Sequence, residues 1–142
     1  MEYKRHQHSV YLLTYHAVFV TKYRRKVITT EILKFMRENT RRLLEKNGGS
    51  LLEFNGEEDH IHVLFELPPI STPPKVIGAL KTQLSRNVRT EYGDQLRDKL
   101  WKDSFWSDSY FLTTTGGASI DVIEEYIQQQ GTPRKKRKYT QH

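Results

Sequence analysis

The sequence predicts a single domain of the α+β class, and three observations lead to this prediction. The 142 residues suffice for one packed domain and are few for two. Strand-like and helix-like segments follow one another in the order strand, helix, strand, strand, helix, strand, helix, with no internal repeat. Hydrophobic residues make up 36% and charged residues 28%, a balance typical of a globular protein rather than a chain of membrane spans.

The first half of the chain contains three expected strands and one helix. Residues 11–21 are rich in β-branched and aromatic residues, with apolar side chains at both parities, which predicts an interior strand covered on both faces. Residues 30–46 show helical spacing of apolar side chains, begin with a threonine and stop before an Asn-Gly-Gly turn. Residues 50–55 and 60–67 are separated by a polar turn, so we expect a hairpin.

The second half begins with a loop, because residues 67–74 contain four of the five prolines. An amphipathic helix is expected over 75–92, ending near Gly93. The aromatic segment 100–111 is interpreted as supplying a last strand that runs toward Thr115, and residues 120–130 as a final helix.

This order of elements is that of a ferredoxin-like or RNA-recognition-like sheet, with an added C-terminal helix that carries Tyr126. We assign residues 1–133 to this one domain. Residues 134–142 include a run of basic residues and are interpreted as a basic flexible tail. Many unrelated activities use such a fold, so the fold alone does not decide the function.

The charge of the chain is distributed unevenly. Its formal net charge is +6, yet residues 22–46 alone carry +6 and residues 134–138 carry +5, while residues 47–133 carry −6. This asymmetry indicates a polyanionic partner such as nucleic acid. The first residues lack the apolar stretch of a secretory signal, so we expect a cytoplasmic location. The absence of cysteine excludes disulfides, thiolate metal sites and a cysteine nucleophile.

Two histidines, in the run Asp59-His60-Ile61-His62-Val63, form the most informative local pattern. In a strand, His60 and His62 project from one face, about 6.6 Å apart at Cα, while apolar residues fill the opposite face. Two imidazoles at this spacing can bind one metal ion, with a third ligand from elsewhere, and an oxygen ligand would leave the metal's identity open. A histidine phosphoesterase would need a second copy of the motif, which the chain lacks.

The last expected helix combines an apolar stripe with a polar edge. Ile120, Ile123 and Ile127 form the stripe. Tyr126 and Gln130 share one edge of it, about 6 Å apart along the helix axis. Spacing alone favours a tyrosine that borders the core with its hydroxyl in water, and a tyrosine nucleophile is the other interpretation.

A histidine pair on a strand, without an acidic triad, and a tyrosine followed four residues later by glutamine together resemble the HUH-class single-tyrosine transposases of bacterial insertion sequences. These are the IS200-like enzymes of the insertion-sequence 200/605 type. The resemblance extends from about Tyr11 to Gly131 and covers most of the domain. Four pieces carry it, in the order and spacing of that family: YHAVFVTKYRRKV, DHIHVLFEL, LWKDSFWSDSYFLTTTGG and IDVIEEYIQQQ.

The resemblance implies a transposase that cleaves and rejoins single-stranded DNA in a bacterium or archaeon. His60, His62 and Gln130 would be ligands of a divalent metal ion, Mg²⁺ or Mn²⁺. Tyr126 would attack the scissile phosphate and form a 5′-phosphotyrosine intermediate, leaving a free 3′ hydroxyl. The partners implied are single-stranded DNA with hairpin ends and a second copy of the chain in a homodimer, in which the tyrosine helix can act in cis or in trans.

Basic and aromatic residues near the first strand and first helix are candidates for contact with DNA. Exposed members of the group Tyr23, Trp101, Phe105 and Trp106 could stack on unpaired bases, although packing in the core is the favoured role of the tryptophans. The residues expected to bind DNA phosphates are Lys22, Arg24, Arg25, Lys26, Arg37, Arg41 and Arg42.

Two other functions remain compatible with the sequence. A related HUH nickase or replication initiator performs the same first step, although the small size and the single tyrosine on the final helix argue against it. A non-catalytic module that binds single-stranded nucleic acid on its sheet would need neither the histidine pair nor Tyr126.

Overall fold

The computed structural model describes residues 4–6, 9–11, 13–100, 104–114 and 120–131. The basic tail expected over 134–142 and the predicted stacking residue Trp101 lie outside these residues. None of the helices in the described ranges combines the length and the apolar character that a membrane span requires.

The described elements follow the expected order, preceded by a short ribbon that the sequence did not predict. The strands β1 and β2 form this separate antiparallel pair. In chain order the elements are β1 (Lys4–His6), β2 (Ser9–Tyr11), β3 (Leu13–Val20), the 3₁₀ turn η1 (Lys22–Arg24), α1 (Thr30–Lys46), β4 (Ser50–Gly56), β5 (His60–Leu67), α2 (Pro73–Leu100), β6 (Phe111–Thr114) and α3 (Ile120–Gln129).

The main sheet has four strands in the order β4-β5-β3-β6. Every neighbouring pair is antiparallel, and β3 pairs with both β5 and β6, so its predicted interior position is confirmed. The predicted hairpin is the pair β4 and β5. This spatial order, together with the chain order strand, helix, strand, strand, helix, strand from β3 to β6, is the ferredoxin-like arrangement. The predicted α+β fold class is therefore confirmed.

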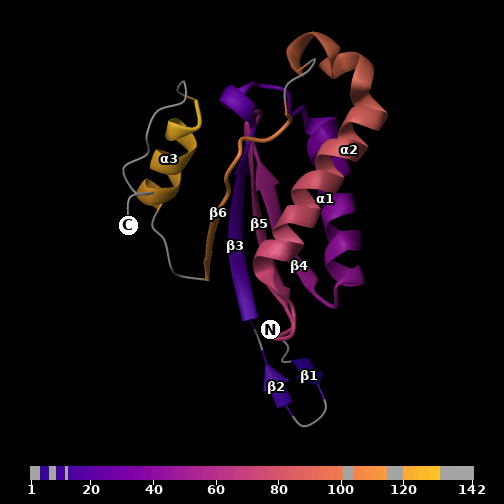
Figure 1. Ribbon diagram of the computed structural model, residues 1–142, viewed down its shortest axis with the longest axis vertical. Coiled ribbons are helices and arrows are strands. Elements are labelled where there is room, and N and C mark those ends of the chain that lie inside the picture. Colours follow the sequence, from indigo (N-terminus) through magenta and orange to yellow (C-terminus); the bar gives the residue numbers. More distant parts are fainter. Residues whose placement is uncertain (1–3, 7–8, 12, 101–103, 115–119, 132–142) are drawn as a thin grey trace.

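The two faces of the sheet are covered by different helices, as Figure 1 shows. Helices α1 and α2 lie on one face, where the main core contains fully buried side chains such as Phe19 and Phe65. Helix α3 lies on the other face, which we call the α3 face. There Val18 and Val20 of β3 form a second, smaller core with side chains of α3. The period of two along β3 therefore divides its side chains between two cores.

Helix α1 has the bounds that the sequence predicts. The side chain of Thr29 accepts a hydrogen bond from the backbone N–H of Ile32, 3.1 Å away, and so caps the first turn. After the last turn, Gly48 adopts a φ of 79°, a conformation that favours glycine and closes the helix.

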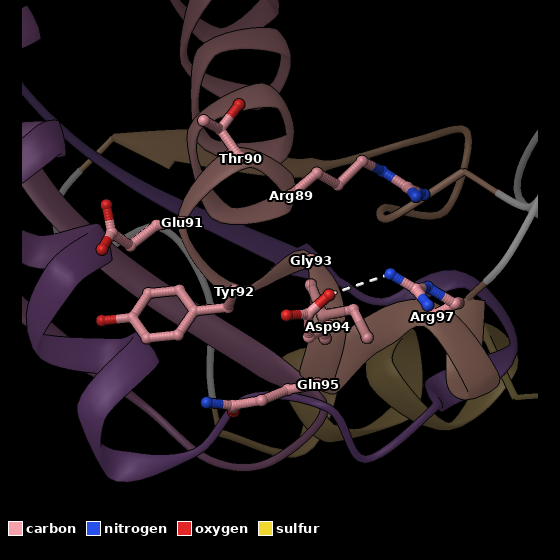
Figure 2. A pocket seen from close by; sticks show the side chains of 9 residues that line it. Arg89, Thr90, Glu91, Tyr92, Gly93, Asp94, Gln95 and Arg97 are labelled. Carbon is pink, nitrogen blue, oxygen red and sulfur yellow. Dashed lines mark hydrogen bonds and ion pairs between the residues drawn. The ribbon is translucent and has the colours of Figure 1, made fainter.

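Helix α2 is longer than predicted at both ends, although its first segment does end at a non-helical residue, Tyr92, next to the expected end near Gly93. The helix can begin at Pro73 because the backbone N–H groups of a first turn have no partner within the helix, so a residue without an N–H is tolerated there. It continues to Leu100 because Leu96 and Leu100 are buried in the core. The axis bends at Tyr92, whose φ and ψ are −122° and 25°. Figure 2 shows this bend and the cleft of about 610 Å³ beside it, which none of the predicted site residues lines.

The last strand is shorter than predicted and begins later in the chain. Strand β6 covers only Phe111–Thr114, and Trp106 forms no more than a single bridge to Thr21. The ammonium of Lys81 donates hydrogen bonds to two backbone carbonyl groups of the segment before β6. These are the carbonyls of Ser107, at 2.8 Å, and of Ser109, at 3.0 Å. Phe105 and Trp106 are buried in the main core, so packing rather than base stacking is their role in the fold.

The main core makes one prediction about stability. Phe65 is fully buried in β5, so Phe65→Ala should lower the free energy of unfolding by about 3–5 kcal/mol through lost burial and a residual cavity. Ile70, with 83% of its surface exposed, is the matched control, and Ile70→Ala should change the value by no more than about 0.5 kcal/mol. Urea titration followed by circular dichroism measures both, and similar losses in the two variants would contradict this description of the core.

Candidate active site

The histidine pair lies on the face of β5 that points away from the main core. Ile61 and Val63 are fully buried on the core side, so the alternation of the strand directs His60 and His62 to the α3 face. The strand register places His62 opposite Val18 and His60 opposite Val20. Because these two valines pack against α3, the histidine pair and the final helix share one face of the sheet.

His60 is held by the carboxylate that precedes it in the chain. Its Nδ1 lies 2.7 Å from Oδ1 of Asp59, while the other carboxylate oxygen accepts a hydrogen bond from Nε of Arg24 at 3.1 Å. Burial by itself raises the pKa of Asp59, but the hydrogen bonds from His60 and Arg24, with their charges, outweigh it and lower this pKa. Asp59 is therefore a carboxylate at neutral pH, with a partner on each oxygen.

His62 is held by a third histidine that lies on the neighbouring strand. Its Nδ1 is 3.3 Å from Nε2 of His16, and the two rings stack with their centroids 5.5 Å apart. Burial lowers the pKa of His62 to about 4, with further lowering by His60 and His16. The imidazole of His62 is therefore neutral at pH 7, which is the protonation state that a metal ligand requires.

Sequence reasoning missed the role of His16. It lies on β3 and far from the histidine motif in the chain, and only the register between β3 and β5 brings it against His62. The available signal was its position in the alternation of the strand. His16 is spaced by two and four residues from Val18 and Val20, so it lies on the same face of a strand that the sequence placed in the sheet interior. Parity gives the face of a strand, but the partner strand and its register decide the contact.

The donor atoms fit an open metal site better than a closed one. With both Nδ1 atoms engaged, each histidine has Nε2 left for a ligand. Nε2 of His60 faces the exposed carboxylate of Glu57 at 4.0 Å. Among the described residues, no group of three His, Cys, Asp or Glu side chains could hold a metal ion. A metal bound here would therefore take its remaining ligands from an amide, water or a phosphate.

Tyr126 lies on α3 and packs into the small core of the α3 face. It is 5% exposed, and its ring centroid is 5.7 Å from that of Phe111. Spacing alone suggested that its hydroxyl lies in water. Instead, the hydroxyl lies 2.8 Å from Oγ of Ser109. Ser109 precedes β6, and β3 separates β6 from the strand of the histidine pair, so this contact directs the hydroxyl toward the far edge of the sheet.

The C-terminal end of α3 is connected to the histidine pair through Arg24. Gln130 is buried, and its amide nitrogen donates a hydrogen bond to the carbonyl of Tyr126 at 3.3 Å. The next residue, Gly131, lies so close to Arg24 that an added Cβ would be 2.6 Å from Cδ of the arginine. Because Arg24 also binds Asp59, the end of the helix that carries Gln130 lies beside the support of His60.

The predicted DNA-binding residues fall into two groups. The first group lies at and just after η1, which follows the end of β3, and contains Lys22, Arg24, Arg25 and Lys26. The second group lies on α1, in the helical layer across the sheet from the histidine pair, and contains Arg37, Arg41 and Arg42. Arg41 forms ion pairs with Glu38 and Glu45 of its own helix.

Two members of the first group lie against an exposed aromatic ring. Tyr23 is 50% exposed, and the cationic groups of Lys22 and Arg25 lie 5.6 and 5.2 Å from its ring centroid. Tyr23 and Arg24 also have positive φ values of 57° and 54°, which side chains other than glycine rarely adopt. Of the described candidates for base stacking, Tyr23 is the one that remains exposed.

Comparison with known proteins agrees with the resemblance in the sequence. Over 72 residues the chain is 33% identical to the ISDra2 transposase TnpA of Deinococcus radiodurans, a match that covers 51% of each protein. It is 35% identical over 72 residues to the transposase for insertion sequence element IS200 of Salmonella typhimurium, covering 51% of this chain and 46% of that protein. The chain thus spans about half the length of the curated relatives it matches.

Two solved structures are similar to the chain. A Deinococcus radiodurans protein assigned as a transposase aligns with a TM-score of 0.82 and 27% identity, covering 92% of this chain and 99% of that one. A REP-associated tyrosine transposase bound to a REP hairpin aligns with a TM-score of 0.54 and 12% identity, covering 87% and 68%, and this likeness concerns the fold alone. The family model described as "Transposase IS200 like" matches residues 9–130, and this chain therefore belongs to the IS200-like transposase family.

Proposed function

We propose that this chain cleaves and rejoins single-stranded DNA through a 5′-phosphotyrosine intermediate, with the help of a divalent metal ion. Tyr126 is the proposed nucleophile. The proposed metal ligands are His60, His62 and Gln130, and the ion is Mg²⁺ or Mn²⁺. The observation that carries the proposal is that the histidine pair and the helix with Tyr126 and Gln130 occupy the same face of the sheet.

The chemistry of the ligands supports a metal-assisted reaction. Two imidazoles and an amide oxygen leave coordination positions open, and a phosphate oxygen of the substrate can occupy one of them. When bound, the metal ion polarises the scissile phosphate and orients the bond that breaks. His60 and His62 hold their ring orientation through partners on Nδ1, so they present Nε2 without losing further side-chain freedom.

The proposed reaction exchanges one phosphoester bond for another. The hydroxyl of Tyr126 loses its proton to solvent while its oxygen bonds to the phosphorus, and the bond from phosphorus to the 3′ oxygen of the DNA breaks. That oxygen takes up a proton and leaves as a 3′ hydroxyl. Because the phosphotyrosine keeps the ester bond, another 3′ hydroxyl can displace the tyrosine and rejoin the DNA without a nucleotide triphosphate.

The position of the tyrosine hydroxyl supports a conformational step before the reaction. Its partner, Ser109, lies on the β6 side of the sheet, while the histidine pair is on β5. We propose that α3 shifts on its own sheet, or docks on that of a second copy in a homodimer, when the substrate binds. Among the described residues, the core that α3 forms with Val18 and Val20 is the smaller of two clusters, which suits a helix that moves.

Single-stranded DNA with hairpin ends is the proposed substrate. The basic groups at η1 and on α1 are the proposed phosphate contacts, and the exposed ring of Tyr23 can stack on an unpaired base. The REP-associated transposase, which shares the fold, is bound to a REP hairpin. This likeness of fold supports the proposal that the DNA substrate of this chain has hairpin ends.

The main alternatives are a related HUH nickase or replication initiator and a non-catalytic module for single-stranded nucleic acid. A nickase would perform the same first step and form the same adduct. A binding module would form no adduct. Adduct formation therefore distinguishes the two kinds of enzyme from the binding module.

Tyr126→Phe provides the central test of the proposal. The wild-type chain, incubated with single-stranded DNA that carries a terminal hairpin and with Mn²⁺, should form a covalent adduct that survives denaturing electrophoresis. Tyr126→Phe should abolish the adduct and still bind the hairpin, because only the hydroxyl is lost. His60→Ala should likewise bind without cleaving. An adduct formed by Tyr126→Phe would remove Tyr126 from the mechanism, and full cleavage by His60→Ala would remove the metal assignment.

The basic group at η1 makes a second prediction. If about five phosphates are contacted, log affinity for single-stranded DNA should fall with log salt with a slope of about −3.5. Lys22→Ala/Lys26→Ala should reduce the size of this slope by about 1.4, since each lost contact removes about 0.7. Lys75→Ala/Lys99→Ala removes the same charge from the acidic part of the chain and should leave the slope unchanged. Equal effects of the two double variants in fluorescence anisotropy titrations would contradict a localised DNA surface.

A further inference from the structure

Two residues outside the proposed ligand set engage the histidine pair in the same way. Asp59 meets Nδ1 of His60 at 2.7 Å, and His16 meets Nδ1 of His62 at 3.3 Å. The two contacts come from different parts of the fold, one from the residue before β5 and one from β3. Each contact involves the ring nitrogen nearer the backbone, which leaves the outer nitrogen, Nε2, for a ligand.

From these contacts we infer that Asp59 and His16 are positioning residues that fix both histidines in the Nδ1–H tautomer, with both Nε2 lone pairs directed to one metal ion. The inference rests on the proposed function, because it assigns the support of the proposed metal site. Neither residue touches the substrate or the ion, and both act through the ligand that they hold.

The contact with Asp59 permits only one direction of donation. A carboxylate accepts hydrogen bonds, so Nδ1 of His60 must carry the proton, and the lone pair of a neutral ring is then on Nε2. The carboxylate is itself held by Arg24 on its other oxygen at 3.1 Å, and it is 7% exposed. Its position is therefore fixed before any metal binds.

The contact between the two imidazoles permits two directions of donation, and only one of them leaves His62 able to bind a metal ion. If Nε2 of His16 donated its proton, His62 would be protonated on Nε2 and could not be a ligand. If Nδ1–H of His62 donates to Nε2 of His16, the lone pair on Nε2 of His62 remains available. The ring of His16 stacks on that of His62, with the centroids 5.5 Å apart, and the ring of His60 contacts it edge-on, with the centroids 4.9 Å apart. Both contacts restrict rotation of the His62 ring.

The matched substitutions at His16 separate hydrogen bonding from packing. His16→Phe keeps an aromatic ring against His62 but removes the acceptor. His16→Gln removes the ring but can place its amide oxygen near the position of Nε2. We therefore expect His16→Phe to weaken Mn²⁺ binding by about 10- to 100-fold, the usual effect of losing such a partner, and His16→Gln to recover most of the loss. Thr14→Val, on the same strand and of the same parity, should leave Mn²⁺ binding unchanged.

The same reasoning applies at Asp59. Asp59→Ala should weaken Mn²⁺ binding by about 10- to 100-fold, and Asp59→Asn should weaken it less because an amide oxygen can still accept from His60. If Asp59→Ala fails to fold, since it also loses the ion pair with Arg24, Asp59→Asn and the His16 series still test the inference.

Two measurements complete the test. Titration of Mn²⁺ followed by electron paramagnetic resonance gives the affinity of the full chain without any turnover. Long-range ¹H–¹⁵N spectra of histidine-labelled protein in EDTA report the tautomer of each ring, and we expect Nδ1–H for His60 and His62 in the wild type. His16→Phe should shift only His62 toward the Nε2–H form, and Asp59→Ala should shift only His60.

The outcomes distinguish this inference from the proposed function. If the wild type binds Mn²⁺ but His16→Phe and the Asp59 variants bind equally well, with unchanged tautomers, the positioning role is wrong while the proposed function stands. If the wild type binds no Mn²⁺, whereas hairpin DNA still binds, both the metal assignment and this inference are overturned.

Discussion

The alternation of side chains along β5 is the constraint on which the rest of the site depends. Ile61, Val63 and Phe65 are fully buried on one side of the strand, and this burial fixes which side faces the helices α1 and α2. A slip of one residue would move the apolar set out of the core and the imidazoles into it, at a cost of several buried side chains. The same packing that stabilises the sheet therefore holds the histidine pair on the α3 face.

The segment between α2 and β6 links the two layers of helices around the edge of the sheet. Lys81 of α2 binds the carbonyl groups of Ser107 and Ser109, and the side chain of Ser109 reaches Tyr126 of α3. Burial lowers the pKa of Lys81, although Asp108 partly opposes this effect. An ammonium that leaves water needs the two carbonyl acceptors, so Lys81 ties this segment to α2. The same segment carries Ser109, the partner of the tyrosine hydroxyl.

Local patterns in the sequence predicted the parts of the fold that local patterns control. The period of two along β5, the bounds of α1 and the polar turn between β4 and β5 are all encoded by adjacent residues, and each was confirmed. The capping threonine of α1 is Thr29, one residue before the threonine that opens the predicted helix. The errors concern features that distant residues decide. Helix α2 passes Gly93 because the core receives Leu96 and Leu100, and the long final strand is replaced by a segment that Lys81 holds. The contact of His16 with His62 required a register that no single segment encodes.

The turn at η1 couples the local backbone to the support of the histidine pair. Tyr23 and Arg24 both hold left-handed conformations, which cost about 1–2 kcal/mol each for residues with a Cβ, and the ion pair with Asp59 helps to keep Arg24 there. Glycine at position 24 would relieve this backbone strain, yet it would also remove the guanidinium that binds the buried carboxylate of Asp59. A relaxed backbone and a supported His60 therefore favour different residues at this one position.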